Sequence, residues 1–246
     1  MSSNPLDGRV ALVTGGGVRV GRAIALALGA AGADVAVHYR GSAADAEQVA
    51  ASIRAAGRRA TALAADLSRP DACSELVRAT ATALGGLDLL VHSAANFHRA
   101  SLEQTDAALW DDAMNLNARA GFLLAREAAP LLRARKGRVV LISDLLASAP
   151  VRRYAAHSVS KAAVEGIVRA LAIELAPEVS VNGVAPGTVL VPEGTSAELE
   201  ARWAAEAPLG RNGTAEDVAA TVLFLCSGPS FITGQIVRVD GGKSLL

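Results

Sequence analysis

The chain has 246 residues, enough for one large α/β domain with a full core, and its 24 lysines and arginines balance 24 aspartates and glutamates. A net charge of zero removes the electrostatic reason to expect a nucleic acid or an anionic membrane as a partner. The sequence contains only two cysteines, Cys73 and Cys226, as expected for a protein of a reducing compartment. Its cysteines and histidines do not cluster in a metal-binding pattern, so we expect no metal site.

The beginning of the chain, MSSNPLDGRVALV, lacks the basic region and the continuous apolar stretch of a signal peptide. The longest uncharged apolar run, Ala23 to Ala33, is too short to span a bilayer. These patterns predict a cytoplasmic protein with no membrane partner.

Short apolar runs then alternate with longer alanine-rich segments of helical character. The runs consist almost entirely of Val, Leu, Ile and Ala, which is typical of parallel strands buried on both faces. We expect strands at 9–14, 34–39, 60–66, 87–93, 137–143, 179–185 and 235–240. We expect helices near 20–31, 43–56, 70–84, 105–134, 155–176 and 214–226. This alternation predicts one α/β domain over residues 1–246, a Rossmann-type doubly wound parallel sheet of about seven strands with helices on both faces.

A glycine-rich turn, TGGGVRVGRAIA (Thr14–Ala25), joins the first expected strand to the first expected helix. Glycines allow the backbone to approach a pyrophosphate closely, and the helix N-terminus then faces the phosphates. A merely tight turn is the alternative. The strand before it and the helix after it favour a dinucleotide site.

The residues after the second strand, HYRGSAAD, are suited to one form of the dinucleotide. An acid at this point usually binds the ribose hydroxyls of NAD, but here Arg40 and Ser42 precede the first acid, Asp45. A guanidinium and a hydroxyl suit a 2′-phosphate, and Arg19 inside the glycine turn adds positive charge. The pattern predicts NADP(H), with an ordinary exposed loop arginine as the alternative for Arg40.

The stretch YAAHSVSKAAV places His157 and Lys161 four residues apart, on one face of an expected helix. Tyr154 lies three residues before His157 and can extend the same stripe. These groups form either a proton-transfer site or a row of ordinary surface side chains. Later, the segment Thr188 to Gly213 contains Pro192 and Gly194 and delays the next main helix. We expect a lid or substrate-binding loop there, with a surface insertion as the alternative.

The whole chain resembles the short-chain dehydrogenase/reductase family. The pattern T-G-x-x-x-G-x-G matches Thr14–Gly21 except at Arg19, and the N-N-A-G element is degenerate as HSAAN, His92–Asn96. The family's Asp near the adenine, its Asn of the active site, its Pro-Gly turn and the Lys of its Y-x-x-x-K motif match Asp66, Asn117, Pro186–Gly187 and Lys161. His157 occupies the position of the catalytic Tyr.

Within the family the chain is similar to the pteridine reductases. The shared features are the arginine in the glycine turn, HY…SAA, Asp144 in place of the catalytic Ser, and Phe97 after the degenerate element. The resemblance implies NADPH-dependent reduction of a pterin C=N bond, with the pterin between Phe97 and the nicotinamide. It also implies a homotetramer packed through the helices near 105–134 and 155–176.

The site that follows from these motifs has three parts. The expected catalytic residues are Asn117, Asp144, His157 and Lys161, and the expected substrate residues are Phe97, Asp144 and Tyr154. The expected cofactor residues are Gly15, Arg19, Val20, Gly21, Tyr39, Arg40, Ser42, Asp66, Leu67, Ser93, Ala94, Ala95, Lys161, Pro186, Gly187 and Thr188.

The exchange of Tyr for His157 leaves three hypotheses open. An imidazole, whose reference pKa of about 6.5 is near neutral, can donate the proton, with Asp144 orienting it and Lys161 binding the nicotinamide ribose. Tyr154, one turn earlier, can supply a hydroxyl instead. Alternatively, catalysis is lost and the protein binds NADPH without reacting. A carbonyl reductase acting on a ketone or 3-oxo-acyl group is the alternative activity, and core packing is the alternative role for Phe97.

Overall fold

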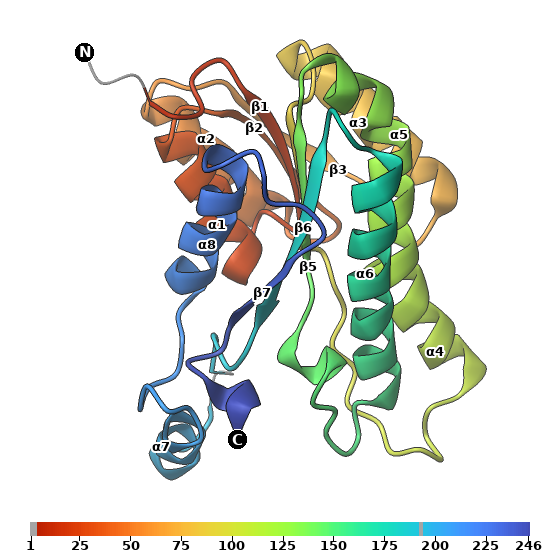
Figure 1. Ribbon diagram of the computed structural model, residues 1–246, viewed down its shortest axis with the longest axis vertical. Coiled ribbons are helices and arrows are strands. Elements are labelled where there is room, and N and C mark those ends of the chain that lie inside the picture. The colour runs from red at the N-terminus through yellow and green to blue at the C-terminus, as the bar shows by residue number, and fades with distance from the viewer. Residues whose placement is uncertain (1–3, 192–193) are drawn as a thin grey trace.

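A computed structural model describes residues 4–191 and 194–246, so Pro192 of the expected lid segment lies outside the described residues. A parallel sheet forms the middle of three layers, with helices on each face (Figure 1). Its seven strands run in the order β3-β2-β1-β4-β5-β6-β7. They are β1 (Val10–Thr14), β2 (Asp34–Tyr39), β3 (Ala60–Ala64), β4 (Leu89–His92), β5 (Arg138–Ile142), β6 (Ser180–Pro186) and β7 (Ile236–Val239). The expected fold class is confirmed.

Two apolar cores explain why the strands lack a polar face. Helices α3 (Pro70–Leu84), α5 (Ala120–Ala134) and α6 (Ala155–Glu174) cover one face, where Leu12, Leu90 and Leu141 are buried. Helices α1 (Arg19–Ala30), α2 (Ala43–Ala55) and α8 (Ala215–Ser227) cover the other, where Val13, Val91 and Val140 are buried. Successive strand residues point to opposite faces, so a strand covered on both sides is mostly apolar along its whole length.

The helix expected over 105–134 is not uniform, which corrects the sequence-based prediction. It consists of α4 (Ala107–Ala113), a π-helical turn η1 (Met114–Arg119), and α5. Single π-helical turns inside α-helices often occur at functional sites. This one holds Asn117, which is fully buried.

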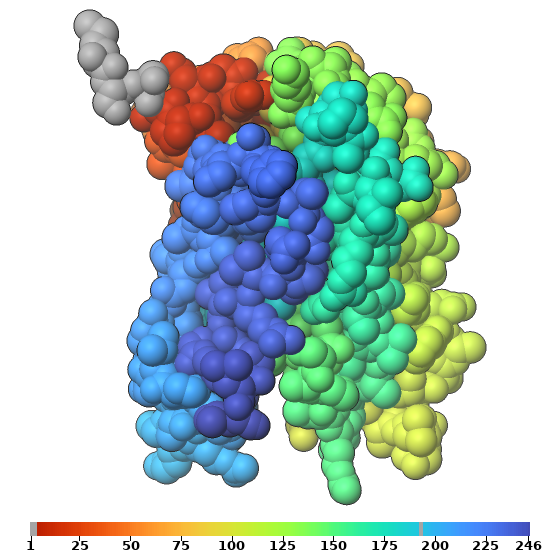
Figure 2. Space-filling model, viewed as in Figure 1, coloured from red at the N-terminus to blue at the C-terminus, as the bar shows by residue number. Residues whose placement is uncertain are grey.

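The segment expected as a lid contains a helix, α7 (Ala197–Ala205), whose first turn is capped by Ser196. In Figure 1, α4, α7 and the beginning of α6 lie at the same end of the molecule, at the bottom of the view. In Figure 2 the surface at this end is notched between the dark-blue C-terminal segment and the green segment that precedes α6. Among the described residues, every helix is too short or too polar to cross a membrane.

Candidate active site

The glycine turn lies where the strand order reverses, between β1 and its neighbours β2 and β4. Gly15 has a φ of 64°, and a Cβ atom there would lie 3.0 Å from the Cα atom of Ala94. A Cβ atom on Gly21 would overlap the carbonyl oxygen of Gly15. The turn is therefore packed tightly between α1 and the end of β4 without side chains, and its bare backbone fits the close approach of a diphosphate.

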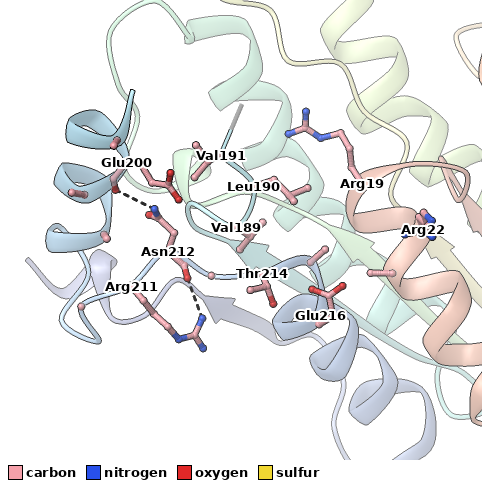
Figure 3. A pocket seen from close by; sticks show the side chains of 17 residues that line it. Arg19, Arg22, Val189, Leu190, Val191, Glu200, Arg211, Asn212, Thr214 and Glu216 are labelled. Atoms are coloured by element: carbon pink, nitrogen blue, oxygen red, sulfur yellow. Dashed lines mark hydrogen bonds between the residues drawn. The ribbon is translucent and has the colours of Figure 1, made fainter. Parts of the chain in front are cut away.

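Arg19 stands where the family pattern has a glycine, and its φ of 51° lies in the left-handed region that favours glycine. For a residue with a Cβ atom the left-handed region costs about 1–2 kcal/mol. Its exposed side chain extends from α1 toward Leu190 (Figure 3). A strained arginine beside a bare glycine turn suits the binding of a phosphate group.

Two buried histidines that the sequence analysis missed hold this turn in place. The first, His38, is the last residue but one of β2: its Nδ1 accepts the Gly15 N–H at 3.1 Å, and its Nε2 donates to the Ala65 carbonyl at 3.1 Å. Burial lowers the pKa of His38, which keeps Nδ1 free to accept. His38 lies within a mostly apolar strand, and nothing in the pattern of that strand distinguishes it. The sequence therefore carried no signal for this role.

The second, His92, is the first residue of the degenerate HSAAN element. Its Nε2 donates to the Leu116 carbonyl at 3.1 Å, and its Nδ1 accepts from the Thr14 hydroxyl at 2.9 Å. The Thr14 oxygen in turn accepts the N–H groups of Ser93 and Ala94, both at 3.1 Å. Although the motif is degenerate, its first residue still has a structural role. His92 lies in β4 and connects this strand by hydrogen bonds to β1 and to the π-helical turn.

Replacing His92 with Asn is expected to make the protein less sensitive to acid. Burial, and secondly the charge of Lys161, lower the pKa of His92 from 6.5 to about 3. The neutral ring therefore contributes stability that is complete above pH 6.5 and is lost as the pH falls toward 3. At two pH units below the unfolded value the loss is about 2–3 kcal/mol.

Urea unfolding at pH 7 and near pH 4.5 measures this effect. The decrease in the free energy of unfolding between the two pH values should be smaller in His92→Asn than in the wild type. Any loss that is independent of pH cancels in this difference. Equal decreases would contradict the assignment.

The adenine end of the site combines charged groups from β2, α2 and the end of β3. Ser42 begins α2 without a side-chain bond to the helix, and Arg40 is exposed beside it. Asp66 accepts the Ser68 N–H at 3.1 Å and the Ser68 hydroxyl at 2.7 Å. These bonds, followed by the charges of Arg40 and Arg69, lower the pKa of Asp66. Within residues 4–191 and 194–246, the side chains of Arg40 and Ser42 make no hydrogen bond, so their donors fit a phosphate.

The other expected cofactor residues lie along the same edge of the sheet. They are Val20 in α1, half-buried Tyr39 at the end of β2, buried Leu67 after β3, Ser93, Ala94 and Ala95 after β4, and Pro186, Gly187 and Thr188 at the end of β6. Gly187 packs against β7, because a Cβ atom there would lie 2.9 Å from the Cα atom of Asp240. This placement brings the expected set together at the carboxyl ends of the strands.

Asn117 joins the loop after β4 to α6. Its Oδ1 accepts the Asn96 N–H at 2.9 Å, and its Nδ2 donates to the Ser160 hydroxyl at 2.9 Å and to the Asn96 carbonyl at 3.3 Å. The buried amide therefore fixes the backbone of Asn96 on both sides. The loop that carries Phe97 begins from this fixed point.

His157 is buried, with 3% of its surface exposed, and both ring nitrogens face oxygen atoms. Nδ1 lies 3.2 Å from the Asn96 carbonyl, and Nε2 lies 3.3 Å from Oδ2 of Asp144. A carbonyl accepts only, and so does an ionised carboxylate, so the doubly protonated ring satisfies both partners. The expected contact between His157 and Asp144 is present, and it orients the ring.

Lys161 lies on the same buried face of α6 as His157, with 4% of its surface exposed. Its Nζ donates to the Ile142 carbonyl at 2.7 Å, at the end of β5. Burial lowers the pKa of Lys161 to about 8, and the charge of Asp144 partly opposes this shift. The ammonium is therefore still mostly charged at neutral pH and keeps two further N–H groups for a ligand.

Phe97 is 57% exposed, so the alternative of core packing is wrong. Its ring centroid lies 4.5 Å from that of His157 in a T-shaped arrangement and 4.7 Å from that of Tyr154 in a tilted one. An exposed aromatic face over a buried histidine offers a stacking surface beside the Asp144–His157 pair.

A pocket of about 810 Å³ adjoins the glycine turn, between α1, α7 and the beginning of α8 (Figure 3). Arg19 and Arg22 line it on one side, and Val189, Leu190 and Glu200 line it on the other. The described part of the segment 188–213 thus forms a wall beside Arg19, on the α1 side of the sheet, whereas His157 lies on the α6 side. Whether this segment closes as a lid stays a prediction.

Comparison with known proteins extends over nearly the whole chain. A family model described as "Enoyl-(Acyl carrier protein) reductase" matches residues 17–244. Versicolorin reductase 1 of Aspergillus parasiticus is 37% identical over 98% of this chain and 99% of its own. The 3-oxoacyl-[acyl-carrier-protein] reductase FabG of Staphylococcus aureus is 35% identical over 94% and 96%. The crystal structure of a dehydrogenase/reductase from Sinorhizobium meliloti 1021 aligns with a TM-score of 0.91 at 36% identity, covering 98% of this chain and 97% of that one.

The parallel sheet, the reversal of strand order and the bare glycine turn define a Rossmann-type dinucleotide-binding domain. The matched proteins identify a family within this class, because their sequences are more than 30% identical to this chain over nearly its whole length and the solved structure has the same fold. The chain belongs to the short-chain dehydrogenase/reductase family, whose members are oxidoreductases that use NAD or NADP.

Proposed function

We propose that this protein is an NADPH-dependent reductase of a flat, conjugated C=N substrate of the pterin class, with His157 as the proton donor. The observation that carries the proposal is the exposed Phe97 ring, in T-shaped contact with the buried His157 ring that faces Asp144. A planar heteroaromatic ring lying on Phe97 would be next to the buried His157 ring and the partly exposed Asp144 carboxylate that faces it.

The nicotinamide, when bound, supplies a hydride, and the chain supplies binding groups and a proton. Arg40, Ser42 and Arg19 would hold the phosphates, and the ammonium of Lys161 would bind the ribose hydroxyls beside the nicotinamide. The bare glycine turn would accommodate the diphosphate, since side chains there would fill its place.

The proton at Nε2 of His157 is the one available to a substrate, because Nδ1 faces inward to the Asn96 carbonyl. His157 itself is almost fully buried, whereas the side chain of Asp144 is 27% exposed. The proton therefore leaves along the edge of the ring that Asp144 faces, directly or through a water molecule. Asp144 holds the ring in the orientation that makes this transfer possible.

Carbonyl reduction is the second candidate. Two relatives with high coverage have names that state other reductase activities, versicolorin reductase and 3-oxoacyl-[acyl-carrier-protein] reductase. The same donor and hydride geometry serves a C=O group as well as a C=N group. The stacking surface of Phe97 favours a flat substrate over an extended acyl chain.

Replacing Phe97 with Ala is expected to weaken the binding of a flat substrate or antifolate about 2- to 13-fold, because a stacked aromatic pair contributes about 0.5–1.5 kcal/mol beyond area burial. NADPH affinity should stay unchanged. The measurement is oxidation of NADPH with dihydrobiopterin, dihydrofolate, a quinone and a diketone, with both proteins. Equal KM values in the two proteins for the pterins would contradict the stacking role, and exclusive activity on the diketone would favour the carbonyl reductase. Binding of NADPH without reduction of any substrate would favour a non-catalytic protein.

We also propose a homotetramer in a reducing, cytoplasmic setting. Exposed apolar side chains on α4, α5 and α6 support the assembly through these helices: Trp110, Phe122, Val159 and Ile173. The two buried, unpaired cysteines, Cys73 and Cys226, support the reducing setting. Light scattering of the purified protein gives the mass that tests the tetramer.

A further inference from the structure

Asp112, on α4, binds the loop after β4 on both sides of Phe97. Its Oδ2 accepts from Nδ2 of Asn96 at 2.6 Å and lies 2.7 Å from Nε2 of His98. Its backbone carbonyl accepts from the same Asn96 amide at 3.0 Å. One carboxylate therefore holds residues 96 and 98, and the stacking ring between them has little freedom to move away.

The same contacts reach the proposed proton donor. The Asn96 carbonyl lies 3.2 Å from Nδ1 of His157. Asn117 fixes the backbone of Asn96, and Asp112 fixes its side chain. The position of this carbonyl therefore depends on two anchors, one buried in the π-helical turn and one partly exposed on α4.

We propose that Asp112 is a positioning residue that aligns the Phe97 ring and the Nδ1–H group of His157 together, through Asn96 and His98. The role of Asp112 in turnover rests on the proposed function, but its effect on the hydrogen bond from Nδ1–H of His157 does not. Without Asp112, only the Asn117 amide holds the Asn96 backbone, and its bond to the Asn96 carbonyl is long, at 3.3 Å, so this carbonyl is held less closely in line with Nδ1. The His157 ring can then rotate, and the proton on Nε2 loses its direction toward the substrate.

The variants are Asp112→Ala, which removes the carboxylate, Asp112→Asn, which keeps one acceptor oxygen, and Asn96→Ala, which removes the other partner. Asp111→Ala is the matched control, since Asp111 is an exposed aspartate on the same helix. Thermal unfolding checks that each variant is folded. Proton NMR of protein labelled with ¹⁵N-histidine observes the Nδ1–H signal of His157, which a hydrogen bond protects from exchange with water. His157→Phe assigns this signal among the four histidines.

We expect the Nδ1–H signal to broaden or disappear in Asp112→Ala and in Asn96→Ala, to be largely kept in Asp112→Asn, and to be unchanged in Asp111→Ala. On a substrate that the wild type reduces, kcat should fall about 10- to 100-fold in Asp112→Ala with unchanged NADPH affinity. The double variant Asn96→Ala/Asp112→Ala should lose no more than the single ones, since both act through one contact. An unchanged signal in the folded Asp112→Ala variant overturns the proposal. A lost signal with no measurable turnover in any protein, including the wild type, supports the alignment and contradicts only the proposed function.

Discussion

Replacing His157 with Phe is expected to lower kcat about 10²- to 10⁴-fold, the usual contribution of a general acid. The phenyl ring keeps the size and the contact with Phe97, but it carries no proton for the substrate. NADPH affinity should stay close to that of the wild type. Stopped-flow measurement of a single turnover separates the loss of the chemical step from any loss of binding.

The matched control is Tyr154→Phe, because Tyr154 also contacts Phe97 and offers the other candidate hydroxyl. We expect this variant to keep most of its activity. His157→Tyr restores the family motif and should keep or raise it. If Tyr154→Phe abolishes turnover and His157→Phe does not, the tyrosine is the donor.

The dependence on pH offers an independent check of the same assignment. A histidine donor is competent only while its ring is protonated, so turnover should fall at high pH as the ring loses its proton. A phenol keeps its proton to higher pH, so His157→Tyr should extend activity into alkaline solution. Identical pH profiles in both proteins would contradict a histidine donor.

Replacing Arg40 with Asp is expected to abolish or reverse the preference for NADPH. One charge-assisted contact with the 2′-phosphate contributes about 1.5–3 kcal/mol, so the wild type should bind NADPH about 10- to 150-fold more tightly than NADH. The aspartate repels the phosphate and can accept from ribose hydroxyls instead. Calorimetric titration of both proteins with both cofactors measures the two ratios.

The control for this experiment is Arg22→Asp, since Arg22 is an exposed arginine of α1 that lines the neighbouring pocket. It changes the net charge equally and should leave the ratio of the two affinities nearly unchanged. Equal affinity of the wild type for NADPH and NADH would show that Arg40 is an ordinary loop arginine.

Patterns along the chain were enough to predict the fold class, and they also named the residues of the candidate site. Strands that are mostly apolar along their whole length require helices on both faces, and a glycine turn between a strand and a helix indicates where a dinucleotide binds. A spacing of four residues placed His157 and Lys161 on one face of α6. All of these features are local along the chain, so periodicity and spacing reveal them.

Contacts between residues that are far apart in the sequence became visible only in the tertiary structure. His38 and Gly15, or His92 and Thr14, meet only because the carboxyl ends of neighbouring parallel strands lie together. The π-helical turn is equally invisible to a helical pattern, since one widened turn barely changes the spacing of apolar residues. The loops packed across the end of the sheet determine that Phe97 lies at the surface and which oxygens face the ring of His157. The sequence could not show this, because contacts between distant residues arise only when the whole sheet has formed.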